Sequence, residues 1–537
     1  MKKWSVVVIL GCAQFVMVLD GTVMNVSIAT VVEDLDSSVA SMQAAITFYT
    51  LTMAAFMLLG AKLGDVWGRR RALVIGSIIY AVGSLVTALS PTMGVLFLGW
   101  SIIEGLGAVL VIPAVAALIA DNYTGRARIT AFATIGAVSG AAVAAGPLIG
   151  GAVTTYANWR YVFVAEVVIM AVVVLLARSI PQAAAPRAVR IDAPSVLVSA
   201  LGLVLLIFGM LQSKTWGWII PAHPPVIAGV AVAPLGVSLS AWFVVAGAAL
   251  LFVFVARQRR LSATGRDPLL HVELLQLLQL RSGLGALGGQ YAVTAGLFFM
   301  VPVYLQMTLG LDALQTGVRI FPLSLSLILF SILGTRLATT WSPRRIVRTG
   351  QVVLVASCVV LLSAIDPELS GLPFGIGMFC AGAALGLLAS QLGNVNMSAV
   401  TEKDTSEVGG MQGVFQNLGS SLGTALIGSV LIGSLATSFA AGVAQSALPD
   451  EVRQTVSERT AGGVEILPAA SIPDIAKEAG LSDADAVLLA RVYADSQLAS
   501  LPTAFFGLIA LALFALLFSR GIPNDVLTTA GARRRAS

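Results

Sequence analysis

Long apolar runs separated by short polar breaks divide this sequence, and they constrain its fold more than any other feature. A helix needs about 20 mostly apolar residues to cross a bilayer. Runs of that length predict roughly fourteen membrane-spanning helices. We place them near residues 5–26, 41–63, 73–91, 94–120, 127–154, 160–178, 195–212, 240–257, 284–308, 314–337, 346–365, 371–394, 411–436 and 500–519.

The composition agrees with this division. Of the 537 residues, 57% are hydrophobic and 11% are charged, whereas soluble domains carry about 25% charged residues. That is too little polar surface for a soluble enzyme, and too much apolar surface for a disordered chain. A net charge of +5 gives no indication of a nucleic-acid partner. With two histidines and three well-separated cysteines, we expect no metal centre, disulfide framework or cofactor.

Lysine and arginine positions predict the orientation of the spans, because these residues gather in cytoplasmic loops. With the amino terminus inside, 25 of the 32 basic residues fall in cytoplasmic segments. We therefore expect both termini to be cytoplasmic, in a bacterial inner membrane. The leucine-rich stretch within 258–282 predicts a short helix on the inner membrane surface. The external loop 437–499 is expected to be a partly helical cap.

Three acidic residues lie inside predicted spans: Asp20 in the first, Glu104 in the fourth and Glu166 in the sixth. An ionisable side chain at this depth is costly and is a candidate functional residue. The spans offer no obvious basic partner, and burial favours the neutral form of a carboxyl. Acids that gain and lose protons at this depth suit a proton-coupled protein. Alternatively, each acid is neutral and hydrogen-bonded in a helix contact.

The fifth span has an unusual spacing of small residues. They are Gly136, Gly140, Gly146, Pro147, Gly150 and Gly151. Small residues at four-residue intervals let two helix backbones approach closely, and a proline among them bends the helix. Simple helix packing is the alternative interpretation.

The loop between the second and third spans combines glycines with charged residues. They are Gly60, Gly64, Asp65, Gly68, Arg69 and Arg70. The glycines permit a sharp turn, and Asp65 suits the start of the following helix. The arginines are expected to pair with Asp65 or with another loop, latching the inner side in one state. The alternative is an orientation signal combined with a helix cap.

Together these segments resemble the major facilitator superfamily, and specifically its fourteen-span drug:proton antiporters. Residues 19–26 are similar to the first-helix motif, an Asp-x-Thr followed by Val-Asn-Val. The loop is similar to the Gly-x-x-x-Gly-Asp-x-x-Gly-Arg-Arg pattern, the fifth span to the antiporter motif, and residues 158–163 to the sixth-helix entry.

The resemblance implies an all-α membrane fold with two six-helix bundles and two inserted helices. Residues 1–180 would form the first bundle and residues 283–537 the second, which includes the external loop. Residues 181–282 would hold the inserted helices 7 and 8 with a cytoplasmic linker and the interfacial helix. The substrate would bind between the bundles near the membrane midplane.

The fourth span departs from the family pattern. The family usually has Arg-x-x-Gln-Gly-x-Gly there, whereas this chain has Ser101 in place of the arginine and Glu104 in place of the glutamine. Glu166 stands where the family often has asparagine. We therefore expect Asp20 and Glu104 to carry the proton, with Glu166 assisting. An acidic cavity also favours cationic substrates.

The resulting hypothesis is export of lipophilic, cationic drugs in exchange for protons, by a monomer in the lipid bilayer. Polar candidates for the substrate cavity are Asn25, Ser101, Gln290, Gln306, Asn394, Asn396, Gln412, Gln416 and Asn417. Alternatives on the same scaffold are a dedicated exporter of one endogenous metabolite or lipid, and an uptake symporter. A membrane enzyme is disfavoured, because the sequence has no catalytic constellation or phosphate-binding loop.

Overall fold

The computed structural model describes residues 4–123, 125–181, 191–221, 224–227, 230–366, 371–400, 405–460, 464 and 466–525. Within them, thirteen helices are long and apolar enough to cross a membrane, and the bent helix α7 makes a fourteenth if it is one span. The prediction of an all-α membrane fold with about fourteen spans is confirmed.

The first half of the chain contains six spans. Its elements are α1 (Ser5–Val26), α2 (Ile28–Asp34), α3 (Val39–Trp67), α4 (Arg69–Ala88), α5 (Met93–Leu96), η1 (Phe97–Glu104), α6 (Gly105–Asn122), α7 (Gly125–Tyr156) and α8 (Arg160–Ala177). Element η1 is a π-helix, and together with α5 and α6 it forms one span, Met93–Ile119. The predicted first span, 5–26, coincides with α1.

The middle of the chain contains the two inserted spans. They are α9 (Ala193–Trp216) and α10 (Leu239–Ala263), followed by the 3₁₀ turn η3 (Val272–Gln276). Between α9 and α10 lie the two-residue antiparallel strands β1 (Val226–Ile227) and β2 (Val230–Ala231), and the 3₁₀ turn η2 (Pro234–Gly236). The prolines of this stretch explain the interruption, because proline cannot supply helical N–H groups.

The second half of the chain contains the remaining six spans and a helical extension. Its elements are α11 (Leu278–Val303), η4 (Tyr304–Thr308), α12 (Ala313–Leu337), α13 (Pro343–Ser363), α14 (Gly371–Met397), α15 (Thr405–Gln445), α16 (Asp450–Thr460), η5 (Ala469–Ser471), α17 (Ile472–Glu478), α18 (Asp483–Leu517) and η6 (Phe518–Gly521). Helix α15 has 41 residues and is about 60 Å long, twice the thickness of a hydrocarbon core.

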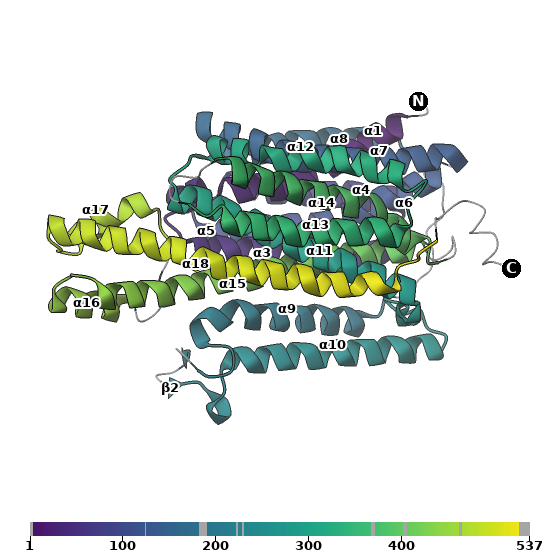
Figure 1. The fold of residues 1–537 in the computed structure, drawn as a ribbon. Coiled ribbons are helices and arrows are strands. Elements are labelled where there is room, and N and C mark those ends of the chain that lie inside the picture. Colours follow the sequence, from purple (N-terminus) through teal and green to yellow (C-terminus); the bar gives the residue numbers. More distant parts are fainter. Residues whose placement is uncertain are drawn as a thin grey trace.

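The spans lie side by side in one bundle (Figure 1). Helix α4 packs on α6 and α8, and α1 packs on α7; in the second half α11 packs on α15, and α14 packs on α12 and α13. The two halves meet along two seams, where α3 packs on α15 and α7 packs on α12. The start of α1 and the end of α18 lie at one end of the bundle, and α16 and α17 extend beyond the other.

The inserted pair covers one of these seams. Helix α9 packs on both α3 and α15 through a cluster of buried apolar side chains: Leu51, Ala55, Ala200, Leu203, Ile207, Leu211 and Ala425. Helix α10 packs closely on α9, since a Cβ at Gly247 would lie 2.6 Å from the Gly202 carbonyl oxygen. Only 17% of the span window of α10 is buried, so most of this helix faces outward.

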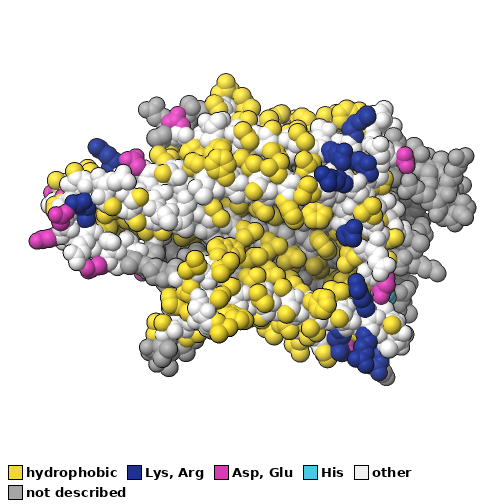
Figure 2. All heavy atoms as spheres, turned by 60° about the horizontal axis from the view of Figure 1, so that its bottom comes forward, with side chains coloured by type: hydrophobic (Ala, Val, Ile, Leu, Met, Phe, Trp, Pro, Cys, Tyr) yellow, Lys and Arg dark blue, Asp and Glu magenta, His cyan; other side chains and the backbone are white. Residues whose placement is uncertain are grey.

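The surface has the polarity of a membrane protein. Figure 2 shows a broad hydrophobic band around the helices, with lysine and arginine gathered at the end of the molecule where α1 begins and α18 ends in Figure 1. The lysines and arginines that the sequence analysis assigned to one side of the membrane thus lie mainly at one end of the molecule. Several of them, such as Arg187 and Arg533, lie outside the described residues.

The expected interfacial helix within 258–282 is wrong. Helix α10 continues to Ala263, η3 is a single 3₁₀ turn, and α11 already begins at Leu278. Leu270, Leu274 and Leu275 pack against residues near the first turns of α11 and α15. These leucines therefore pack on the bundle.

Candidate functional site

The three predicted acids come together inside the first half of the molecule. Asp20 on α1, Glu104 at the end of η1 and Glu166 on α8 each place one carboxyl oxygen within 4.8 Å of the other two. All three side chains are fully buried. We call these three residues the acid cluster. Their separation in sequence gave no indication that they would share one site.

Glycines on α4 and α6 bring the helices that carry the cluster into contact. A Cβ at Gly83 would lie 2.5 Å from the Glu104 nitrogen, and a Cβ at Gly107 would lie 2.5 Å from the Tyr80 nitrogen. The α4 backbone therefore lies directly against η1 and α6. This close contact places the side chain of Ser84, on α4, beside Glu104.

Two side chains that were not among the sequence candidates bind the acids. The Ser84 hydroxyl lies 2.9 Å from Glu104 Oε2 and 3.2 Å from Glu166 Oε2. The Trp100 indole Nε1 donates to both Asp20 oxygens, at 2.9 and 3.0 Å. The Trp100 ring stacks on Tyr49 with ring centroids 4.9 Å apart. Trp100 and Glu104 are four residues apart within the π-helix, an element often found at functional sites.

Basic side chains are absent from this environment in the described part of the chain. The groups that interact with the three carboxyls are one another, Tyr49, Tyr80, Trp100 and Ser84. Three ionised carboxylates at this spacing in an apolar interior have no compensating charge. The arrangement therefore has the chemistry of a site that takes up and releases protons.

The glycine helix α7 packs between α1 and α12. Towards α1, a Cβ at Gly146 would lie 1.9 Å from Thr22 Oγ1, and one at Gly150 would lie 2.8 Å from the Val23 side chain. Towards α12, a Cβ at Gly151 would lie 2.5 Å from the Ala313 carbonyl oxygen.

The same helix bends where its proline predicts. The segments Thr134–Val143 and Ala145–Tyr156 meet at 41°. The bend lies four residues before Pro147, where the proline ring displaces the carbonyl of the preceding turn. Gly136, in the other segment, has open space where its Cβ would be, and Gly140 has only a Leu327 methyl at 3.9 Å. The closest glycine contacts of α7 therefore lie on the Ala145–Tyr156 side of the bend.

The charged loop joins three helix ends of the first half. Arg69 lies 3.7 Å from Asp65 and forms a second ion pair with Asp121, at the end of α6. Arg70 donates to the Ile180 carbonyl oxygen, just after α8, at 3.1 Å.

The expectation of a glycine-rich loop is wrong in part: Gly60, Gly64 and Asp65 belong to α3, and only Gly68 lies between α3 and α4. Asp65 is therefore at the end of α3 and not at the start of α4. Gly68 ends α3 with a φ of 91°, a conformation that favours glycine. Gly60 packs against α6, since its Cβ would lie 2.1 Å from the Val109 carbonyl oxygen, whereas the Cβ of Gly64 would lie 3.8 Å from Ala72. Asp121 was not among the sequence candidates, because nothing in its local sequence links it to the loop.

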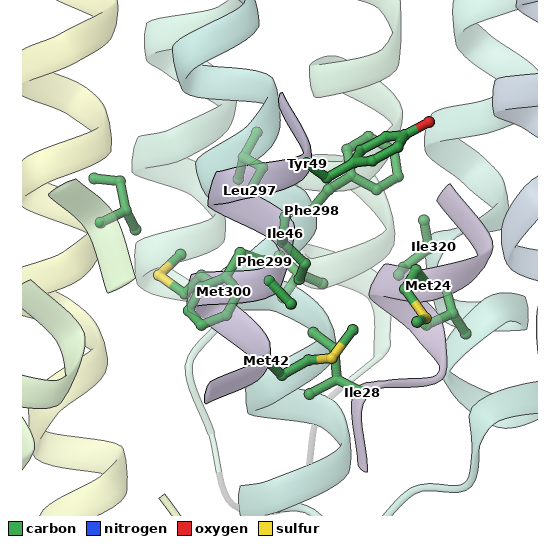
Figure 3. Packing of buried hydrophobic residues seen from close by; sticks show 14 of the residues in the cluster. Met24, Ile28, Met42, Ile46, Tyr49, Leu297, Phe298, Phe299, Met300 and Ile320 are labelled. Carbon is green, nitrogen blue, oxygen red and sulfur yellow. The ribbon is translucent and has the colours of Figure 1, made fainter. Parts of the chain in front are cut away.

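Gln306 lies at the contact between the two halves. Its amide nitrogen donates to the Val26 carbonyl oxygen at 2.6 Å, and its amide oxygen accepts from the Ala29 nitrogen at 3.1 Å. It thus joins η4 to the break between α1 and α2. Figure 3 shows buried apolar side chains from both halves, with Met24 near Ile320 and Ile28 near Met42.

The other polar candidates are of three kinds. Ser101 and Asn25 donate to the carbonyl oxygens of Ala45 and Gly21, and Gln412 and Asn417 to those of Gly393 and Gly413. Gln290 Oε1 and both polar atoms of Asn396 are buried without hydrogen-bond partners. Asn394 is exposed and Gln416 is half-buried.

The helical fold, the bent glycine helix and the buried acids define a polytopic membrane transporter and not an enzyme. The sequence profile described as Major Facilitator Superfamily matches residues 10–424, and the chain belongs to that family.

Two relatives and one solved structure illustrate the relationship. The chain is 30% identical over 448 residues to the puromycin resistance protein pur8 of Streptomyces alboniger, covering 82% of this chain and 84% of that one. It is 27% identical over 450 residues to the probable actinorhodin transporter of Streptomyces coelicolor, covering 82% and 75%. A bacterial homolog of the human lysosomal transporter Spinster shares the fold, with a TM-score of 0.59 at 15% identity and 97% coverage of both chains.

Proposed function

We propose that this protein exports lipophilic, cationic drugs across the cytoplasmic membrane in exchange for protons. The acid cluster is the observation that carries the proposal, because it joins three buried carboxyls from three helices, and none of the described residues supplies a basic partner. The similarity of this chain to the puromycin resistance protein supports drugs as the substrate class.

Transport would proceed by alternating access. Residues 1–180 and 283–537 would form the two moving bundles, and residues 181–282 the inserted pair. Facing outward, the acid cluster takes up protons. Facing inward, it releases them as the substrate binds, and the substrate leaves on the next outward swing. The basic end of the molecule would be cytoplasmic, together with both termini.

The energy source depends on the charge of the substrate. A membrane potential of about 100 mV supplies about 2.3 kcal/mol for each charge that crosses. Exchange of one proton for one monovalent cation moves no net charge, so only the pH difference drives it. Exchange of a neutral drug for a proton uses the potential as well.

A dedicated exporter of one endogenous compound is the second candidate. It is favoured by similarity to the probable actinorhodin transporter, whose name specifies a single compound. The two candidates differ in breadth: a drug exporter protects cells against several unrelated toxic cations, whereas a dedicated exporter does not.

The test is proton movement in inverted membrane vesicles energised with a pH gradient. We expect added ethidium to release protons in wild type, and Glu104→Gln to abolish this release. Glu33→Gln, which changes an exposed acid at the end of α2, is the matched control and should behave as wild type.

Each other result has a defined meaning. Equal proton release in wild type and Glu104→Gln would contradict a coupling role for Glu104. No release in wild type would contradict broad drug export and favour the dedicated exporter.

A further inference from the structure

We propose that Glu104 and Glu166 each carry one exchangeable proton and donate it in a hydrogen bond to the Ser84 hydroxyl. Asp20 stays ionised and accepts a hydrogen bond from the Trp100 N–H. This assignment refines the proposed proton coupling and rests on it. It makes Ser84 and Trp100 positioning residues, and it divides the three acids into two proton carriers and one fixed charge.

The hydrogen bonds of Ser84 carry the first step. Its hydroxyl has one proton to donate and two lone pairs to accept with. It contacts three oxygens: the Tyr80 carbonyl at 3.2 Å, Glu104 Oε2 at 2.9 Å and Glu166 Oε2 at 3.2 Å. A carbonyl oxygen only accepts. All three contacts are separate two-centre hydrogen bonds only if Ser84 donates to Tyr80 and both glutamates donate to Ser84.

The remaining glutamate oxygens agree with this assignment. Glu104 Oε1 and Glu166 Oε1 are buried and have no hydrogen-bond partner. An ionised carboxylate with such an oxygen loses the hydration of a charged group, which costs far more than desolvating the carbonyl oxygen of a neutral acid. With the protons on the two Oε2 atoms, each unpartnered oxygen belongs to a neutral acid.

Asp20 has the opposite environment. The Trp100 N–H is almost equally distant from its two oxygens, at 2.9 and 3.0 Å. A shared donor of this kind suits a carboxylate whose charge is spread over both oxygens. The Tyr49 ring stacks on Trp100, and its buried hydroxyl lies beside Asp20. The stacking of Trp100 on Tyr49 thus fixes the position of the Trp100 N–H donor.

The groups that face the cluster set its total charge. They are Asp20 from α1, Tyr49 from α3, Tyr80 and Ser84 from α4, Trp100 and Glu104 from η1, and Glu166 from α8. With both glutamates protonated, the cluster carries one negative charge. Release of the first proton places a second negative charge beside Asp20 and makes release of the other less favourable. The two protons should therefore leave in two separate steps.

Infrared spectroscopy tests the assignment without requiring transport. The purified full chain in lipid is measured at neutral pH in the C=O stretching region of protonated carboxylic acids. We expect Glu104→Gln and Glu166→Gln each to remove one band, and Asp20→Asn to remove none. Ser84→Ala should move both bands to higher frequency, because both acid O–H groups lose their acceptor.

Ser77→Ala is the matched control. Ser77 lies two turns before Ser84 on α4, is fully buried, and its hydroxyl has no hydrogen-bond partner. Its removal should leave both bands in place, which separates loss of the Ser84 contact from loss of any buried hydroxyl in this helix.

Three results would overturn the proposal: a band lost in Asp20→Asn, a band lost in only one glutamate variant, or unchanged bands in Ser84→Ala. The outcome is independent of the vesicle experiment. If the bands respond as expected and ethidium releases no protons, the proton assignment stands and drug export fails.

Discussion

Gly317 on α12 faces the backbone of Pro147 on α7 so closely that a Cβ at Gly317 would lie 2.2 Å from the Pro147 carbonyl oxygen. Gly151 makes the reciprocal contact with Ala313 one turn away. The two halves of the protein therefore touch backbone to backbone on this side of the α7 bend. A closed seam of this kind tolerates no side chain on either glycine.

Gly317→Leu is predicted to prevent closure of this seam. Overpacking costs about 1–3 kcal/mol, so the closed state should lose roughly tenfold or more in population. We expect the initial rate of ethidium efflux to fall by about the same factor, at equal amounts of protein in the membrane. Gly136→Leu, on the other side of the α7 bend where the Cβ position is open, should retain the wild-type rate. Wild-type efflux by Gly317→Leu would contradict a role for this contact.

Gln306→Ala is predicted to loosen the contact between η4 and the α1–α2 break. The variant loses two hydrogen bonds worth about 1–3 kcal/mol together, so local opening should become up to roughly a hundredfold more frequent. The measurement is labelling of Ile28→Cys, a buried position, with a hydrophilic maleimide in the detergent-purified chain lacking its three native cysteines. Gln454→Ala, on α16 beyond the bundle, is the control. An unchanged labelling rate would show that Gln306 does not hold the halves together.

Much of the architecture is predictable from the sequence, because a bilayer sets both the length and the polarity of each span. The first span and α1 have the same bounds, and Pro147 correctly indicates a bent helix. The leucines after α10 were misjudged because their spacing fits both lipid and protein neighbours. Only the packing shows that they lie on α11 and α15.

The candidate site was only partly predictable. Asp20, Glu104 and Glu166 stand out because acids are rare in apolar spans. Ser84 and Trp100 do not, since a serine and a tryptophan are ordinary in such helices. Their importance comes from the Gly83 and Gly107 contacts and from the π-helix, which depend on three-dimensional packing. The Asn158–Phe163 stretch is a similar case: Arg160 pairs with Asp34, and Trp159 donates to the same carboxylate at 3.1 Å.

The ion pair that joins the inserted helices should depend on pH in a defined direction. Arg257, whose Nε lies 2.7 Å from Asp192, lowers the pKa of the Asp192 carboxyl from 3.8 to about 2. A lowered pKa means that the pair stabilises the fold above about pH 4 and that this contribution disappears as the pH falls towards 2.

Asp192→Asn tests this expectation, because asparagine keeps the helix cap at Ser195 and removes only the charge. The melting temperature of the variant should lie below that of wild type by a constant amount from about pH 8 to pH 5, and the difference should shrink at lower pH. Arg257→Gln should give the same profile. A difference that grows on acidification would contradict the assignment.

The cover that α9 forms over the α3–α15 seam makes the two flanks of the protein unequal. On the opposite flank, α12 presents Val318, Phe321, Leu325 and Leu329 outward, and the Cβ position of Gly136 on α7 is open, with no atom within 4 Å. A compound dissolved in the bilayer would therefore reach the α7–α12 seam directly, whereas α9 and α10 lie between the lipid and the α3–α15 seam.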